Sequence, residues 1–286
     1  MKVGFIGAGK AGCSLGKYFE TASQEVCVTG YYSLIEEEAI WAAQFTNSHF
    51  FQNMDDVIAA SDSIIVSTPD GVIKSVWDTL DKSKISGKMI CHLSGSLSSD
   101  VFSSCGDYGA YPISIHPMFA FSNKESVFEQ LKNVSFTLEG HTYAIEKWQE
   151  LFAMLGNDTV VIVKEAKSKY HAAASVLSNH VVAVLSMGYE LLKECGFSEE
   201  EARAFSQVLV RENVEHVIKD GAIQALTGPI ERGDEETVTK HLGVLKDSQK
   251  DMYRACGNQL LSLSKVKNPE RDYEKIERAL KGEKNQ

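Results

Sequence analysis

Short apolar runs alternate with amphipathic stretches over the first half of the chain. Residues 64–66 read Ile-Ile-Val, a continuously apolar run that is typical of a parallel strand buried on both faces. We predict strands at 2–6, 25–31, 63–67, 88–93, 111–116, 134–138 and 159–163. Helical stretches fall between several of them, at 10–20, 36–45, 55–60 and 72–80. This alternation predicts an α/β fold with a doubly wound sheet.

The pattern changes near residue 165, where apolar positions recur at the spacing of long helices. We predict helices at 167–195, 198–220 and 235–265. Ser198 and Asp234 each precede acidic residues, as helix caps do. The chain is therefore predicted to have an N-terminal Rossmann domain at 1–164 and an all-α C-terminal domain at 165–286. The long helices are expected to form a homodimer, and a polar tail at 281–286 to fray.

The first strand runs into a glycine-rich turn, Gly7-Ala8-Gly9-Lys10-Ala11-Gly12. Glycine at its three positions permits the tight turn, the close approach of a pyrophosphate and the packing of the next helix on the strand. The N-terminus of that helix also favours an anion. The turn predicts a dinucleotide cofactor, and Lys10 either adds charge for a phosphate or is simply solvated.

Two further turns are expected to border the cofactor. The second strand leads into Tyr32 and Ser33 without the acidic residue that binds a ribose 2′-hydroxyl, so we predict NADP, with NAD the less favoured cofactor. Thr68 and Pro69 end the strand at 63–67 and are expected to lie along the ribose, and Asp70 can cap the next helix.

Bulk composition narrows the function. Hydrophobic residues make up 43% and charged residues 24% of the 286 residues, as in a globular protein with a core. The formal net charge of −10 argues against nucleic acid and anionic membranes as partners. The six cysteines form no C-x-x-C pair, so we expect reduced thiols and no metal site. With no signal-peptide pattern and no long apolar run, we expect a cytoplasmic protein.

Polar residues follow the later strands at the edge where a nicotinamide ring would lie. Ser94 lies in a small turn and would bind the carboxamide or the substrate. His116 ends another strand and is either a proton donor near physiological pH or a half-buried structural histidine. The site is expected at the carboxyl ends of the strands.

The first long helix carries a polar stripe on an otherwise small or apolar surface. At about 100° per residue, the stripe contains His171, Ser175, Ser178 and Asn179. These side chains would bind a substrate, or would form a satisfied polar seam between helices. Lys169 is close enough to reach the same cleft, and a lysine or histidine can protonate the alkoxide formed by hydride reduction. In a later loop, Arg232 would bind a carboxylate or pair with Glu231 or Asp234.

Several motifs together resemble a known family: Gly7-x-Gly9-x-x-Gly12, Ser67-Thr68-Pro69-Asp70, His92-Leu93-Ser94-Gly95, His116-Pro117, the helix 169–179 and the loop 226–234. The chain resembles Rossmann-like proteins that carry the DUF2520 C-terminal domain, within the 6-phosphogluconate dehydrogenase-like superfamily. The resemblance covers nearly the whole chain. It implies an NADPH-dependent oxidoreductase, since some members are alternative ketopantoate reductases of the PanG type.

The resemblance also suggests residue roles. Wider relatives carry a Lys-x-x-x-Asn pair on a helix that acts on the substrate carbonyl. Lys169 is followed four positions later by Ala173, so His171 or Asn179 would take part of that role. The His116-Pro117 turn is similar to that of prephenate dehydrogenases, and pyrroline-5-carboxylate reductases share the architecture.

From these features we expect an enzyme that reduces a small 2-keto acid with NADPH, and ketopantoate is the leading substrate. Prephenate dehydrogenase-like and pyrroline-5-carboxylate reductase-like activities are alternatives. A third alternative is a protein that senses NADP(H) without turnover.

Overall fold

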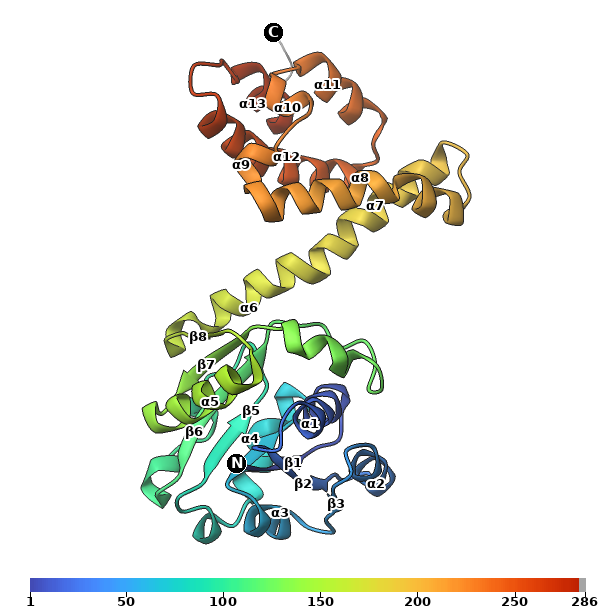
Figure 1. Ribbon diagram of the computed structural model, residues 1–286. Coiled ribbons are helices and arrows are strands. Elements are labelled where there is room, and N and C mark those ends of the chain that lie inside the picture. The colour runs from blue at the N-terminus through green and yellow to red at the C-terminus, as the bar shows by residue number, and fades with distance from the viewer. Residues whose placement is uncertain (283–286) are drawn as a thin grey trace. The chain divides into compact units, whose positions relative to one another are not determined.

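The computed structural model describes residues 1–282, and the chain divides into two compact units, Met1–His180 and Val181–Gln286 (Figure 1). The first unit contains the whole sheet, and the described part of the second contains helices and no strand. The first unit extends beyond the predicted domain end at residue 164, because the first residues of helix α6 (Lys167–Ser175) bind side chains and backbone of the sheet domain. Most of the predicted tail at 281–286 lies outside the described residues.

Eight strands form one sheet. In spatial order they are β3 (His49–Phe50), β2 (Cys27–Tyr32), β1 (Lys2–Ile6), β4 (Ser63–Val66), β5 (Met89–His92), β6 (Tyr111–Pro117), β7 (Phe136–Gly140) and β8 (Thr159–Val161). Neighbouring strands are parallel except β6 and β7, which are antiparallel. The seven predicted strands are all present, and β3 was missed because two residues carry no periodic signal. The strand order reverses between β1 and β4, which is where sheets of this kind bind ligands.

Helices cover both faces of the sheet. They are α1 (Lys10–Ala22), α2 (Glu36–Phe45), α3 (Met54–Ala60), α4 (Asp70–Thr79) and α5 (Thr142–Leu155), with the 3₁₀ turns η1 (Lys82–Lys84), η2 (Ser99–Val101), η3 (Cys105–Tyr108), η4 (Val127–Asn133) and η5 (Lys164–Ala166). Helix α6 follows η5 and continues into the π-helical turn η6 (Val176–His180). Successive residues of one strand enter different cores: Phe5 belongs to the core that contains Trp148 of α5, and Ile6 belongs to the core that contains Trp77 of α4. The sheet is therefore buried on both faces, as its continuously apolar strands predict.

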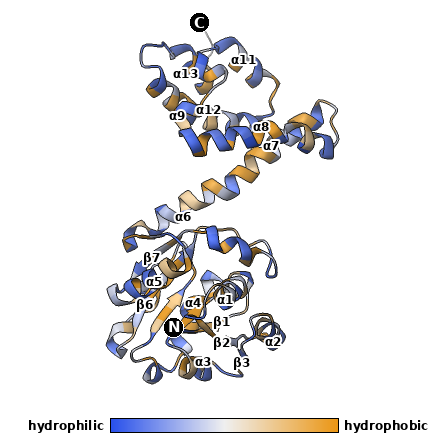
Figure 2. Cartoon of the chain, in the orientation of Figure 1, coloured by the Kyte–Doolittle hydropathy of each residue, from blue (hydrophilic) through white to orange (hydrophobic). Residues whose placement is uncertain are grey.

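The second unit consists of α7 (Val181–Glu194), α8 (Glu199–Asp220), α9 (Ala222–Ala225), α10 (Pro229–Arg232), α11 (Glu235–Val244), α12 (Asp247–Lys267) and α13 (Glu274–Lys281). Both predicted caps are confirmed, since Ser198 accepts a hydrogen bond from Glu201 N and Asp234 accepts one from Thr237 N. In Figure 2, α7 is hydrophobic along much of its length.

The single helix predicted at 235–265 is wrong, because the structure has two helices there. The helix stops after Val244, where buried Leu245 is extended, and restarts with the Lys246 N–H bound to the Gln249 side chain. Burial of Leu245 outweighs the local helical periodicity of the sequence.

Candidate active site

The glycine turn between β1 and α1 has the geometry of a phosphate-binding loop. Gly7 has a φ of +107°, which glycine adopts readily. A Cβ at Gly12 would overlap the Ser67 hydroxyl, which donates a hydrogen bond to Gly7 O at 2.9 Å. A Cβ at Gly9, in contrast, would make only one ordinary contact, 3.7 Å from Ser67 O. No described residue requires glycine at this position, whereas a pyrophosphate approaching the backbone would.

Helix α1 presents its N-terminus to the same place. It begins at Lys10 with neither a side-chain cap nor an acidic residue in its first turn. Its first N–H groups and its dipole therefore favour an anion. Ala8 is buried, Ala11 is half-buried, and the Lys10 side chain is exposed beside the turn.

The predicted ribose-side residues border this loop. Tyr32 O accepts a hydrogen bond from Gly7 N at 2.7 Å, and Ser33 follows directly. The Thr68 methyl group lies 3.1 Å from where a Gly7 Cβ would be, and Pro69 comes next. Within residues 1–282, the buried Thr68 hydroxyl has no hydrogen-bond partner. An orphaned hydroxyl at the edge of the glycine loop fits a polar ligand such as a nucleotide.

Asp70 ties the turn after β4 to the turn after β5. Its carboxylate accepts hydrogen bonds from Ser94 Oγ at 2.7 Å and from Ser96 Oγ at 2.9 Å. The predicted capping role is wrong, because Asp70 is the first residue of α4 and Pro69 occupies the cap position. The single O–H of Ser94 is used for Asp70, so Ser94 organises the turn and has no proton left to donate to a ligand.

His92 fixes the shape of the turn after β5 from inside. Its Nδ1 accepts a hydrogen bond from Ser94 N at 3.1 Å, and its Nε2 lies 3.2 Å from Ser98 O, to which it donates. Burial, with a further contribution from the charge of Lys167, lowers the pKa of His92 to about 4. The side chain is therefore a neutral structural element at physiological pH.

Lys167 is the buried cation at this edge of the sheet. Its side chain is only 2% exposed, and Nζ donates to Ser94 O at 2.8 Å and to Ser114 Oγ at 2.7 Å. Desolvation lowers its pKa to about 8, although the charges of Glu139 and Asp70 oppose that shift. A group with this pKa exchanges its proton close to physiological pH, as a general acid must.

His116 and His171 meet above Gly95. Their rings are 6.1 Å apart and nearly perpendicular. A Cβ at Gly95 would lie 2.8 Å from His116 Nε2 and 2.6 Å from His171 Nδ1, so both rings pack here because the residue is glycine. His116 Nδ1 is 2.7 Å from Tyr170 Oη. The buried His171 Nδ1 has no hydrogen-bond partner among the described residues.

His116 is not charged at physiological pH. Burial, with further contributions from the charges of Lys167 and His171, lowers its pKa to about 4. Its predicted role as a proton donor near neutral pH therefore does not fit the structure, because a neutral imidazole is a weak acid. His116 can still hydrogen-bond a ligand.

A pocket of about 310 Å³ opens beside the two histidines. The predicted polar stripe lies along it, contributing His171, Ser175, Ser178 and Asn179, and His116 joins them. The rest of the lining is mostly apolar: Met118, Phe119, Ala120, Ala174 and Leu177. The stripe continues into the π-helical turn η6, a feature that is common at functional sites.

The sequence singled out Lys169, but the lysine that the structure brings to this edge is Lys167. Lys169 is exposed, whereas Lys167 is buried at the turn after β5, and neither lysine is among the residues that line the pocket. Lys167 precedes His171 by four residues, which is the spacing of the Lys-x-x-x-Asn pair. Testing that spacing from each lysine of the helix would therefore have identified Lys167, with His171 in the place of the asparagine. Ser114 was also missed, although the alternation of a strand places it on the same face as His116.

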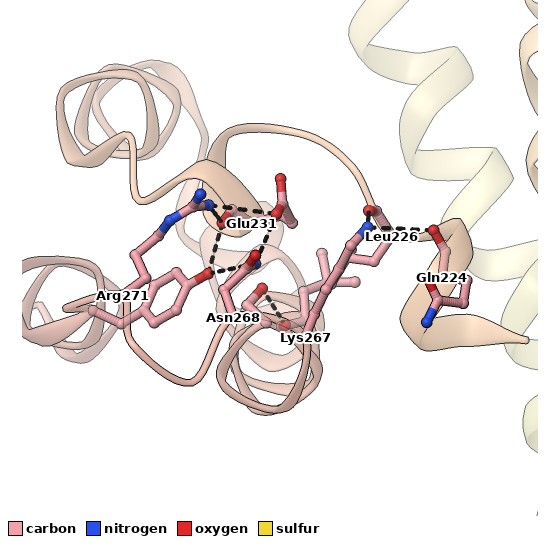
Figure 3. Close-up of polar contacts among 9 residues, drawn as sticks. Gln224, Leu226, Glu231, Lys267, Asn268 and Arg271 are labelled. Atoms are coloured by element: carbon pink, nitrogen blue, oxygen red, sulfur yellow. Dashed lines mark hydrogen bonds and ion pairs between the residues drawn. The ribbon is translucent and has the colours of Figure 1, made fainter.

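Arg232 lies in the second unit, exposed at the end of α10. The preceding Glu231 points inward, where its carboxylate accepts a hydrogen bond from Asn268 at 2.8 Å and its backbone oxygen accepts one from Tyr273 Oη at 2.7 Å (Figure 3). Arg271 pairs with the same carboxylate. This network fixes the loop and leaves the Arg232 side chain outside it.

Comparison with known families agrees with the motifs. Residues 1–117 match a Rossmann-like domain, and residues 134–260 match DUF2520, a domain of unknown function. The chain therefore combines a Rossmann-like domain with a DUF2520 domain, as predicted. No curated protein sequence matches the chain at a significant level.

Several solved structures share this fold. Protein TM1727 from Thermotoga maritima has a TM-score of 0.72 at 23% identity, covering 93% of this chain and 99% of its own. BF3122 from Bacteroides fragilis, described as an NADP oxidoreductase, has a TM-score of 0.67 at 22% identity, covering 94% and 98%. An imine reductase from Myxococcus stipitatus, solved with NADP+, has a TM-score of 0.62 at 16% identity, covering 93% of each chain. These similarities establish the fold.

Proposed function

We propose that this protein is an NADPH-dependent oxidoreductase that reduces a small 2-keto acid, with ketopantoate as the leading substrate. The observation that carries the proposal is the buried Lys167, held between Ser94 and Ser114 at the carboxyl ends of β5 and β6 with a pKa of about 8. A positioned acid of this strength suits the reduction of a carbonyl.

The glycine turn and its neighbours would hold the cofactor. The backbone at Gly7, Gly9 and Gly12 and the N-terminus of α1 fit a pyrophosphate, and Thr68 fits a ribose hydroxyl. Tyr32 and Ser33, which bring no carboxylate, favour the 2′-phosphate of NADP over the 2′-hydroxyl of NAD. When bound, the nicotinamide supplies the hydride.

The chain itself supplies the proton and orients the substrate. Lys167 Nζ gives a proton to the former carbonyl oxygen, and the resulting amine regains a proton from solvent. Ser94 O and Ser114 Oγ hold that nitrogen in place. His171 and Asn179, which line the pocket, would hydrogen-bond the carbonyl and the carboxylate of the substrate.

The pocket favours a short, branched substrate. Its polar residues gather on one helix, while Met118, Phe119 and Leu177 provide an apolar surface suited to a branched carbon chain. Ketopantoate combines a carboxylate, a 2-keto group and a branched apolar centre. This match, together with the resemblance to ketopantoate reductases, supports it as the first substrate to test.

An imine substrate is the second candidate, because proteins of this fold include imine and pyrroline-5-carboxylate reductases. Reduction of an imine proceeds from its protonated, cationic form. The ammonium of Lys167 stabilises a developing alkoxide but repels an iminium cation. The charge at this position therefore favours a carbonyl substrate.

A substrate panel tests the proposal. NADPH and NADH oxidation would be followed with ketopantoate, other 2-keto acids and cyclic imines, and NADP+ reduction with prephenate. We expect turnover of ketopantoate with NADPH at a kcat/KM at least tenfold above that with NADH. Faster turnover of an imine or of prephenate would contradict the proposal. Tight NADPH binding without any turnover would instead indicate a sensor.

We also propose that the protein is a cytoplasmic homodimer. Large apolar side chains of α7 and α8 are exposed, among them Val182, Phe205, Leu209 and Ile218. The described residues contain one helical stretch, Lys164–Glu194, that is long and apolar enough to cross a membrane. Its N-terminal turns, however, hold Lys167 against the sheet, and α8 interleaves charges such as Arg211 and Glu212 with its apolar residues. A second copy suits that mixed surface better than lipid does.

Sedimentation of the purified protein tests this assignment. A dimer that dissociates when Leu209 is replaced by Glu is the expected result. A monomer without detergent, or a protein that is recovered only in the membrane fraction, would contradict it.

A further inference from the structure

A buried carboxylate, that of Glu139, lies in the same part of the sheet as the proposed acid Lys167. Glu139, on β7, is only 5% exposed. One carboxylate oxygen accepts a hydrogen bond from Ser99 N at 2.7 Å, and the other accepts one from Ser99 Oγ at 2.8 Å. Within residues 1–282, no lysine or arginine forms an ion pair with it. A buried charge with only neutral partners is costly unless a more distant charge compensates it.

The sheet brings Glu139 to the same place as Lys167. Ser114 on β6 and Glu139 on β7 are directly opposed in the antiparallel pair, so their side chains project from the same face of the sheet. Lys167 Nζ donates a hydrogen bond to the Ser114 hydroxyl. The ammonium and the carboxylate therefore flank a single serine.

The same two charges also hold the two ends of one turn. Lys167 binds the backbone oxygen of Ser94, and Glu139 binds the backbone N–H and the hydroxyl of Ser99. The turn from residue 94 to residue 99 is thus fixed between a cation and an anion. Its shape sets where the ammonium can lie.

The remaining charged and titratable groups around Lys167 do not replace Glu139. His92 on β5 and His116 on β6 are neutral at physiological pH, and the ring of Tyr170 lies 5.9 Å from Nζ. Asp70 of α4 is the other nearby anion, but it is exposed and already binds two serine hydroxyls. Both carboxylates favour the ammonium form of Lys167, and buried Glu139 raises the pKa of Lys167 more than Asp70 does.

We propose that Glu139 is a positioning residue whose buried carboxylate keeps Lys167 in its ammonium form and fixes the turn that holds it. Only the expected effect of Glu139 on activity rests on the proposed reduction. The electrostatic coupling between Glu139 and Lys167 can be tested without any substrate.

The first test is the pH dependence of kcat with ketopantoate in Glu139→Gln. The amide preserves the size of the side chain and removes the charge. Loss of the nearby anion favours the neutral amine, so the alkaline limb should move down by about one pH unit. Ser99→Ala keeps the carboxylate and should leave the position of the limb unchanged. Glu165→Gln, which removes an exposed charge near the start of α6, controls for net charge and should match the wild type.

The second test is a double-mutant cycle on unfolding by denaturant, with Glu139→Gln, Lys167→Met and both together. With Lys167 present, the loss of Glu139 should destabilise the protein. With methionine there, the same loss removes a carboxylate whose remaining cation, Lys164, is exposed and already paired with Asp100. We expect the two substitutions to be non-additive by at least fivefold in the unfolding equilibrium constant.

The inference is overturned if the cycle is additive, or if the alkaline limb of the pH profile does not move in an active Glu139→Gln enzyme. Either result leaves the proposed function standing. Conversely, a non-additive cycle in a protein that turns over no 2-keto acid supports the coupling of the two charges and rejects only the proposed reaction.

Discussion

Two lysines at helix ends show how a reactive charge differs from a structural one. Lys167 is the first residue of α6, where the helix dipole disfavours a cation, and Lys267 is the last residue of α12, where the dipole favours one. Lys167 is buried and donates to Ser94 O and Ser114 Oγ. Lys267 is only half-buried and donates to the backbone oxygens of Gln224 and Leu226 (Figure 3).

The difference is in what the protein gains from each charge. Lys267 joins two segments of the second unit at a position where a cation is inherently stable. Lys167 occupies a site that lowers its pKa to about 8, so its charge costs stability at neutral pH. Side chains kept in unfavourable surroundings are candidates for function, because stability alone would not select them.

Exchanging each lysine for methionine tests this comparison and should produce the largest effects. Lys167→Met should lower kcat at least 100-fold, because the general acid is lost. Its stability at pH 7 should change by less than about 1 kcal/mol, because the relief of a desolvated charge is offset by the loss of the donor to Ser94 O and of the cation that compensates Glu139. Turnover assays and urea unfolding measure the two quantities.

Lys267→Met is the matched control. It should be less stable by about 1–2 kcal/mol, because two carbonyl groups lose their donor, and it should keep a near-normal kcat. Similar losses of activity in the two variants would remove the distinction between the two lysines.

His92 extends the comparison to a buried group that is structural and neutral. Its pKa is about 4 in the folded protein, against 6.5 for a solvated histidine of the unfolded chain, so the unfolded chain binds more protons between these two pH values. Stability is therefore expected to fall by up to about 3 kcal/mol as the pH drops from 6.5 to 4. Urea unfolding of His92→Asn across this range should show a shallower loss. An equally steep loss would mean that other groups control acid sensitivity.

Two glycines of the cofactor turn provide a third contrast between function and structure. Gly9→Ala meets only ordinary contacts, so it should fold with wild-type stability and bind NADPH at least about tenfold more weakly. Gly12→Ala places a Cβ on the Ser67 hydroxyl and should lose about 1–3 kcal/mol of stability. Fluorescence titration and thermal unfolding separate the two effects. Unchanged NADPH affinity in Gly9→Ala would argue against the proposed position of the pyrophosphate.

The smallest effect is expected for Arg232→Ala. The side chain is exposed, so stability should change by less than about 0.5 kcal/mol. If Arg232 binds the substrate carboxylate, KM for ketopantoate should rise a few-fold at constant kcat. An unchanged KM would leave Arg232 as a surface residue near Asp234.

The sequence predicts the fold well because its signals are local. The glycine turn, the apolar strands and the capped helices each depend on neighbouring residues, and the structure contains all seven predicted strands. The polar stripe of the first long helix was also found, since helical periodicity places His171, Ser175 and Asn179 on one face.

Burial is what the sequence did not reveal. Helical spacing places Lys167 on the same face as His171 and Lys169 on the opposite one, but only the packing of α6 on the turn after β5 shows that Lys167 is buried. Glu139 looks like an outward-facing strand residue until the pairing of β6 with β7 places it beside Ser114. The pKa of His116, which excludes it as an acid at neutral pH, also depends on neighbours that are distant in sequence.

The single-turnover rate of NADPH oxidation with saturating ketopantoate, followed from about pH 6 to pH 10, tests the central claim most directly. If Lys167 protonates the product, the rate is constant on the acidic side and falls on the alkaline side with a midpoint near 8. A rate that stays constant through pH 10 would contradict the account.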